Sequence, residues 1–116
     1  MNEYDLINEL NDLCNKLTHS GEQMKRYGKE LAEAEREYKV CLRQHALNLR
    51  ATKDMPVTLI NQVVYGIPEV ADKRFDRDVA ESMYDAAKES INVLKLKIRI
   101  LDAQISREWQ QAGNNV

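Results

Sequence analysis

The apolar residues of the first half recur at alternating intervals of four and three, and this repeat constrains the fold more than any other feature. Ten of its twelve positions are apolar or aromatic, with Tyr and Cys included: Leu6, Leu10, Leu13, Leu17, Ser20, Met24, Tyr27, Leu31, Ala34, Tyr38, Cys41 and His45. A heptad repeat of this length predicts a helix with one buried stripe in a left-handed coiled coil. Opposite charges four residues apart, as in Lys29 with Glu33 and Glu35 with Lys39, support it. We expect helix over residues 3–51.

Residues 18–21 are the weak point of this helix. Ser20 followed by Gln23 has the spacing of a capping box, which favours the start of a second helix. The repeat nevertheless passes from Leu17 to Met24 without a skip. We therefore favour one continuous helix, with a break near residues 18–21 as the alternative.

Residues 52–68 form a connector with local structure of its own. Pro56 disfavours helix at the residue before it and suits the start of a new helix. Apolar pairs predict a short helix over residues 57–65, with Gly66 as its cap and Pro68 opening the next helix. The many β-branched residues of this segment make a strand the alternative.

The second half repeats the four-three spacing. Its core seam is formed by Ala80, Tyr84, Ala87, Ile91, Leu94, Ile98, Leu101 and Ile105. We expect helix over residues 69–111 and a disordered tail over 112–116, because Gly113 is followed by two Asn. Residues 95–100 alternate with the period of a strand, but no turn residue separates them from their helical flanks.

The distribution of charge indicates the relative direction of the two helices. Residues 1–20 and 69–89 each carry a net charge of −3, and residues 21–51 and 90–116 each carry +2. An antiparallel hairpin places each negative block beside a positive one, and the short connector permits no other arrangement. The expected fold class is therefore all-α: a long antiparallel helical hairpin, or coiled coil, with a short helical connector, forming a single domain.

A second stripe beside the core seam predicts self-association. It consists of Met83, Ala86, Ser90, Val93, Lys97, Ile100 and Gln104. One partner helix cannot cover both stripes, so we expect a homodimer or higher homo-oligomer that closes into a helical bundle. Polar residues such as Lys97 within the stripe suit it to fixing the register.

Composition excludes several classes of protein. Only four Gly and two Pro occur, too few for the frequent turns of an all-β fold. The net charge of −2 is not that of a typical nucleic-acid binder. No apolar run is long enough for a membrane span and residues 1–5 lack a signal core, so we expect a cytoplasmic protein without membrane contact. No nucleophile–base pair or nucleotide-binding motif is found. We therefore expect no enzyme, and assign no catalytic residue, cofactor or metal.

Three groups of residues are weaker candidates for a metal or ligand site. Cys41 and His45 lie four apart and suit a metal completed by a second copy, although we interpret them as seam residues. Asp72 and Asp76, within an acidic stretch that also holds Glu69, Asp78 and Glu81, suit a divalent cation but are interpreted as a solvated face. Six bases suit phosphate or an acidic partner: Lys88, Lys95, Arg99, Lys73, Arg74 and Arg77. The last three follow a short helix and a Gly turn, the outline of a helix-turn-helix.

Four stretches carry a resemblance to known proteins: residues 33–40 (EAEREYKV), 55–60 (MPVTLI), 74–81 (RFDRDVAE) and 91–96 (INVLKL). With the region between about residues 25 and 110, they resemble small helical proteins of phages and prophages of Gram-positive bacteria. The resemblance implies no assigned activity and no catalytic residues. It implies an accessory role in the host cytoplasm, near replication, recombination or host takeover.

The leading functional hypothesis is a non-enzymatic, self-associating helical protein that acts by binding another protein, whose identity the sequence leaves open. Two alternatives are kept. One is a nucleic-acid-associated accessory factor that uses the six bases, with nucleic acid as a less favoured partner. The other is a phage inhibitor of a host enzyme or defence system that uses the acidic face of residues 69–89.

Overall fold

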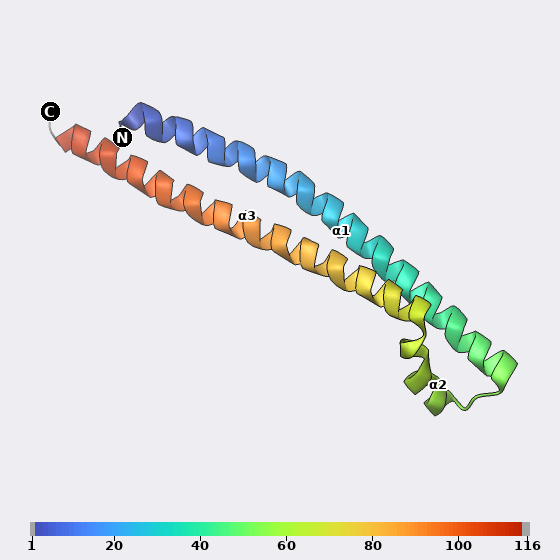
Figure 1. Cartoon of the computed structure of the whole chain (residues 1–116). Coiled ribbons are helices and arrows are strands. Elements are labelled where there is room, and N and C mark those ends of the chain that lie inside the picture. The colour runs from blue at the N-terminus through green and yellow to red at the C-terminus, as the bar shows by residue number, and fades with distance from the viewer. Residues whose placement is uncertain (1, 115–116) are drawn as a thin grey trace. The chain divides into compact units, whose positions relative to one another are not determined.

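The computed structural model describes residues 2–114 and is helical almost throughout, with no strand in that range. Helix α1 spans Glu3–Lys53, α2 spans Val57–Val63, a 3₁₀ helix η1 spans Val64–Gly66, and α3 spans Pro68–Asn114 (Figure 1). The predicted all-α helical hairpin is confirmed. Both segments for which a strand was the alternative are helical.

Helix α1 begins with an Asn cap and runs through residues 18–21 without a break. The backbone N–H of Asp5 donates to Asn2 Oδ1 over 2.9 Å, which satisfies one of the free donors of the first turn. The Thr18 hydroxyl donates to the carbonyl of Cys14 over 3.2 Å. This is a bond within α1 to the carbonyl four residues earlier. The helix also continues past Ser20, the residue that would have capped a second helix.

The C-terminal end of α1 lies two residues beyond the predicted one. Asp54, which follows Lys53, has φ of 45°, the left-handed conformation that commonly ends a helix. The Arg50 guanidinium donates to the carbonyl of Met55 over 3.1 Å and ties the next residue back to the helix. Helix α1 therefore ends at the left-handed Asp54, two residues before Pro56.

The other helix ends differ from the predicted ones because neither expected Gly cap forms. Helix α2 tightens into η1 after Val63, and Gly66 belongs to η1 without a positive φ. Helix α3 starts at Pro68 and continues through Gly113 to Asn114, again without a positive φ at the Gly. The predicted disordered tail is thus wrong for residues 112–114, while residues 115–116 lie outside the described part.

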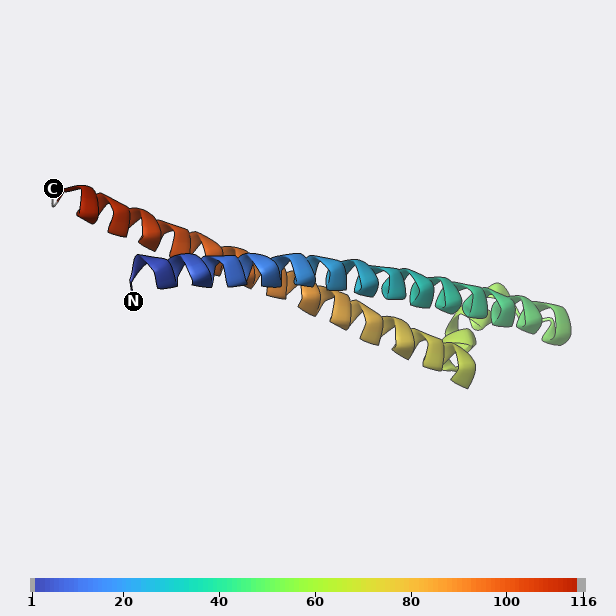
Figure 2. The same cartoon turned by 90° about the horizontal axis from the view of Figure 1, so that it is seen from above.

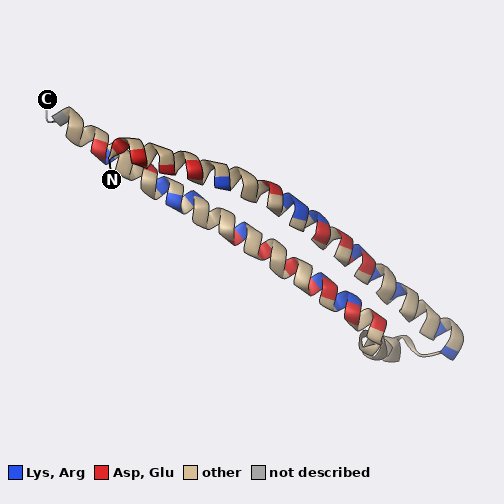
Figure 3. Cartoon of the chain, turned by 45° about the horizontal axis from the view of Figure 1, so that its top comes forward, with Lys and Arg blue, Asp and Glu red and all other residues tan. Residues whose placement is uncertain are grey.

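The chain divides into two compact units. We call residues 26–85 the connector unit and residues 1–25 with 86–116 the terminal unit. Each unit combines a length of α1 with a length of α3, and these are the same partners that the charge blocks predicted. Two of the expected i,i+4 pairs form on α1, Lys29–Glu33 at 4.0 Å and Glu35–Lys39 at 3.2 Å. Figure 3 shows charges along both long helices and none on α2 or η1.

Both predicted core seams are removed from solvent. All twelve positions of the first seam and all eight of the second are buried or half-buried. In the terminal unit the buried hydrophobic side chains are Leu6, Ile91 and Leu101, and of these only Leu6 is fully buried. The heptad spacing therefore identified the packed face of each long helix.

The connector unit has a core of a different kind, with three layers. Helix α2 and η1 lie beside the end of α1 and the start of α3 in both views (Figures 1 and 2). The buried cluster draws on all four elements: Tyr38, Cys41, Leu49, Ile60, Val64 and Val70. At the other end of this unit, a Cβ added to Gly28 would lie 3.3 Å from Tyr84 Cε2. Gly28 thus lets the Tyr84 ring lie against α1.

Candidate functional site

An apolar groove with basic edges lies between α1 and the α2–η1 segment. Its volume is ≈ 930 Å³. Its lining residues are Lys39, Val40, Leu42, Arg43, Ala46, Leu47, Arg50, Val57, Ile60, Asn61, Val64 and Tyr65. Leu47 is 63% exposed and Val57 60%, so the apolar walls face water. Three bases and no acid line the groove, which gives it a positive rim around an apolar floor.

The predicted self-association stripe is exposed along α3. Met83, Ala86, Ser90, Val93, Lys97 and Ile100 are exposed, and Gln104 is half-buried. Val93 is 42% exposed and Ile100 58%, large fractions for aliphatic side chains on a helix. The exposure of this stripe within one chain is what a covering partner requires.

Three of the six candidate phosphate contacts are engaged inside the connector unit. Lys73 Nζ lies 3.4 Å from Glu37 Oε2. Arg77 donates twice to Asp78 Oδ1, over 2.9 and 3.1 Å, and its guanidinium lies 4.8 Å from the centre of the Tyr38 ring. Arg74 lies over Tyr65 at 5.8 Å. These are surface contacts within the unit, and each gives its base a partner in the chain, which weakens the helix-turn-helix interpretation.

The other three bases lie in the terminal unit on α3. Lys95 and Arg99 line a shallow hollow with Leu17, Asn92 and Ile98, and Lys88 is exposed. The structure therefore separates the six bases into two groups, one on each unit.

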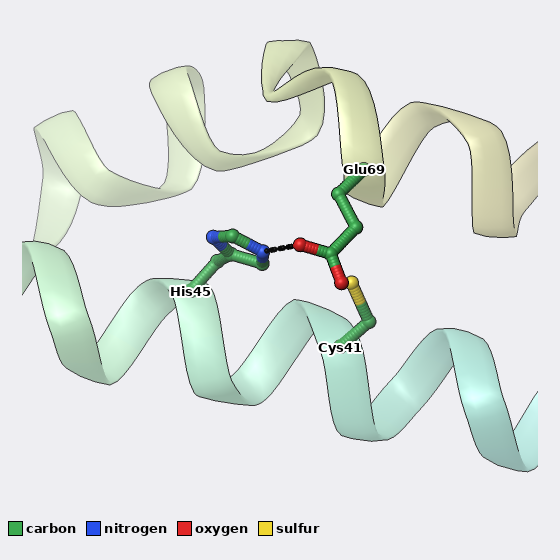
Figure 4. Close-up of side chains that lie close together, drawn as sticks. All are labelled: Cys41, His45 and Glu69. Carbon is green, nitrogen blue, oxygen red and sulfur yellow. Dashed lines mark hydrogen bonds and ion pairs between the residues drawn. The ribbon is translucent and has the colours of Figure 1, made fainter.

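Cys41, His45 and Glu69 meet in the connector unit (Figure 4). The first two project from successive turns of α1, and Glu69 comes from the first turn of α3. His45 Nε2 lies 2.7 Å from Glu69 Oε2, and the ligand atoms of all three lie within 4.8 Å of one another. Cys41 is buried, His45 half-buried and Glu69 exposed.

The electrostatics of this cluster follow from the central carboxylate. Burial, and then the negative charge of Glu69, raise the pKa of the Cys41 thiol above its usual value. The hydrogen bond and charge of His45 lower the pKa of Glu69. The thiol is therefore held protonated, which disfavours the thiolate that a cysteine nucleophile requires.

Glu69 is the member of the cluster that sequence reasoning missed. The sequence pairs Cys41 with His45 by spacing, but groups Glu69 with the acidic stretch. The antiparallel pairing of residues 21–51 with 69–89 was the available signal, because it brings the start of the second helix to the end of the first. Of that stretch, Asp78 accepts from Arg77, and no metal-type cluster among the described residues includes Asp72 or Asp76.

Comparison with known proteins returns no match: no family model, curated protein or solved structure resembles the chain significantly. The phage resemblance therefore stays a prediction. Among residues 2–114, no helix has the length and apolar character that crossing a membrane requires.

Proposed function

We propose that this chain acts without catalysis, as a self-associating helical protein that binds other proteins. The observation that carries the proposal is the apolar stripe of α3, with Met83, Val93 and Ile100 exposed beside a core seam that is buried or half-buried. Fully burying one such side chain stabilises a contact by about 1.5–3 kcal/mol. A second copy of the chain is the partner we assign to this stripe, because a two-fold pair places the same patch of each chain against the other.

The polar members of the stripe favour one register. Ser90 and Lys97 are exposed between the apolar positions at heptad spacing. A charged residue in a helical seam disfavours registers in which it faces apolar side chains. The same residues therefore limit how two copies can pair, while Met83, Val93 and Ile100 supply the exposed apolar surface.

The basic-rimmed groove is the surface left for a different protein. Its apolar walls fit the apolar face of an amphipathic helix, and Arg43 favours a helix whose flank carries Asp or Glu, whereas Lys39 already pairs with Glu35 and Arg50 donates to the carbonyl of Met55. A nucleic-acid role is less favoured, because Lys73, Arg74 and Arg77 have internal partners. An accessory role in a phage agrees with a protein of this kind and remains part of the proposal.

Sedimentation velocity across the micromolar range tests the assignment of the stripe. We expect the wild-type chain to sediment as a dimer or larger species. Replacing two stripe residues, Val93→Lys with Ile100→Lys, weakens association at least tenfold, because it places two charges in the apolar contact. The matched control, Asn92→Lys with Ser106→Lys, adds the same charge to exposed positions outside the stripe and leaves association unchanged.

A groove variant distinguishes the two surfaces. Leu47→Lys alters the groove and is expected to leave the oligomer intact. A wild-type chain that stays monomeric throughout the range would overturn self-association. Loss of the oligomer in Leu47→Lys but not in the stripe variant would move the interface to the groove. Helical circular dichroism verifies that each variant is folded.

A further inference from the structure

We infer that Cys41, His45 and Glu69 form a site for one zinc-like divalent ion, a role that goes beyond the proposed protein–protein contact. Thiolate, imidazole and carboxylate are the three side-chain ligands that zinc uses in proteins. The chain has two Cys and two His, and one of each meets here with a carboxylate within 4.8 Å.

The positions of the three ligands suit a tetrahedral ion. Two of them come from an i,i+4 pair on one rigid helix, a spacing that directs both side chains to one face. With bonds of about 2.0–2.3 Å, the ligand atoms of a tetrahedral zinc site lie roughly 3.3–3.7 Å apart. His45 Nε2 and Glu69 Oε2, now 2.7 Å apart, must separate by about 0.6–1 Å to meet this geometry, and ligand atoms as far apart as 4.8 Å must approach by about 1.1–1.5 Å. The Glu69 side chain is 65% exposed and therefore has room to move.

A solvent-open hollow adjoins two of the three ligands. A hollow of ≈ 330 Å³ is lined by Cys41 and Glu69 together with Arg36, Glu37, Val40, Gln44 and Lys73. It has space for water, and Gln44 adds an amide oxygen. The site thus has the three-ligand form, with one position left for solvent or a further ligand.

The charges of the site balance when the ion is bound. Coordination replaces the thiol proton of Cys41, which passes to the solvent, with a sulfur–metal bond. The resulting thiolate and the Glu69 carboxylate then neutralise a 2+ ion. Arg36 and Lys73 oppose the ion, but Glu37 offsets Lys73, with which it pairs at 3.4 Å.

Cobalt titration of the full, reduced chain tests the site directly. Co²⁺ replaces Zn²⁺ in such sites and reports thiolate ligation by an intense near-ultraviolet charge-transfer band, and tetrahedral geometry by visible bands. We expect one Co²⁺ per chain, with both signals, and displacement of Co²⁺ by one equivalent of Zn²⁺. Cys41→Ser removes the charge-transfer band, and His45→Ala and Glu69→Gln each weaken binding at least tenfold.

The chain provides its own matched controls. Cys14→Ser and His19→Ala remove the other thiol and the other imidazole, both of which lie in the terminal unit, and are expected to leave binding unchanged. The wild-type titration decides the proposal even if a variant fails to fold. Wild-type chain without a charge-transfer band would show that the cluster is only a hydrogen-bonded contact between α1 and α3. A band lost with Cys14→Ser, or one ion per two chains, would also overturn a three-ligand site within one chain.

Discussion

The connector unit and the terminal unit are built from the same two helices, yet they bury their apolar residues to different extents. In the connector unit, six side chains form one buried cluster with contributions from α1, α2, η1 and α3. In the described part of the terminal unit the buried hydrophobic side chains are Leu6, Ile91 and Leu101, and of these only Leu6 is fully buried, although the unit's helical segments are as regular. The connector unit has a third layer, α2 with η1, and the terminal unit has none.

This difference shows what a pair of helices lacks. Two helices in contact cover one stripe each, and any second apolar stripe stays in water. In the connector unit, Ile60 of α2 and Val64 of η1 pack against the two long helices and cover apolar surface that those helices leave exposed. In the described part of the terminal unit Val93 and Ile100 stay exposed, and we propose that a second copy covers them.

The largest expected effect comes from the same truncation made in each unit. Ile60→Ala is expected to lower the free energy of unfolding by about 3 kcal/mol, because a cavity walled on three sides cannot collapse. Ile91→Ala is expected to cost about 2 kcal/mol or less, because two helices can close over the lost methyl groups. Urea unfolding followed by circular dichroism measures both. Equal losses would show that the third layer adds no rigidity.

The alkylation rates of the two cysteines allow the units to be compared without a stability measurement. Cys14 is exposed in the terminal unit, and Cys41 is buried in the connector unit. In metal-free buffer we expect iodoacetamide to alkylate Cys41 at least tenfold more slowly, as mass spectrometry would show. Because its pKa is raised, mainly by burial, the rate at Cys41 continues to rise with pH beyond the usual thiol range. Urea should abolish the difference, and equal rates in native buffer would contradict the buried assignment.

The two interior glycines of α1 offer a smaller test. Gly21→Ala meets nothing within 4 Å and is expected to raise the free energy of unfolding by about 0.8–1 kcal/mol, the usual gain in helix propensity. Gly28→Ala gains the same propensity but crowds Tyr84, so its net gain should be clearly smaller. Thermal unfolding of the two variants gives the comparison. An equal gain at both sites would mean that the Tyr84 ring moves aside freely.

The smallest effect concerns acid. His45 lowers the pKa of Glu69, so this contribution to stability is present above the ordinary carboxyl pKa and is lost as pH falls through the lower folded value. As pH falls below about 5, the free energy of unfolding of Glu69→Gln should therefore decrease less than that of the wild type. Glu9→Gln in the terminal unit controls for the loss of one charge. If the free energies of unfolding of the wild type and Glu69→Gln decrease in parallel as pH falls, the His45–Glu69 contact makes no such contribution to stability.

Spacing and charge predicted most of the fold. Heptad periodicity identified both packed seams down to positions such as Ser20 and His45, because the period of a helix fixes which residues share a face. The charge blocks identified which lengths of helix pair. The helix ends were less predictable, because Asp54 takes the left-handed conformation that sequence rules assign to Gly, while Gly66 and Gly113 do not.

The candidate site was predictable only in part. Cys41 and His45 share a face by local spacing, and the exposed stripe of α3 follows from the same rule. Glu69 joins them only through the path of the connector, which sets where the second helix begins. The engagement of Arg77 over Tyr38 is likewise a long-range contact. Such contacts depend on the tertiary register, which periodicity alone does not specify.

Residues 54–56 also make the chain a natural candidate for limited proteolysis. They are the one run of three consecutive non-helical residues within the described part, and Lys53 beside them is exposed. A cut there severs the covalent link between α1 and the rest but leaves every side chain of the buried cluster in place. The two fragments would then be held by packing alone, so their separation would report how firmly α1 packs against α2, η1 and α3 together.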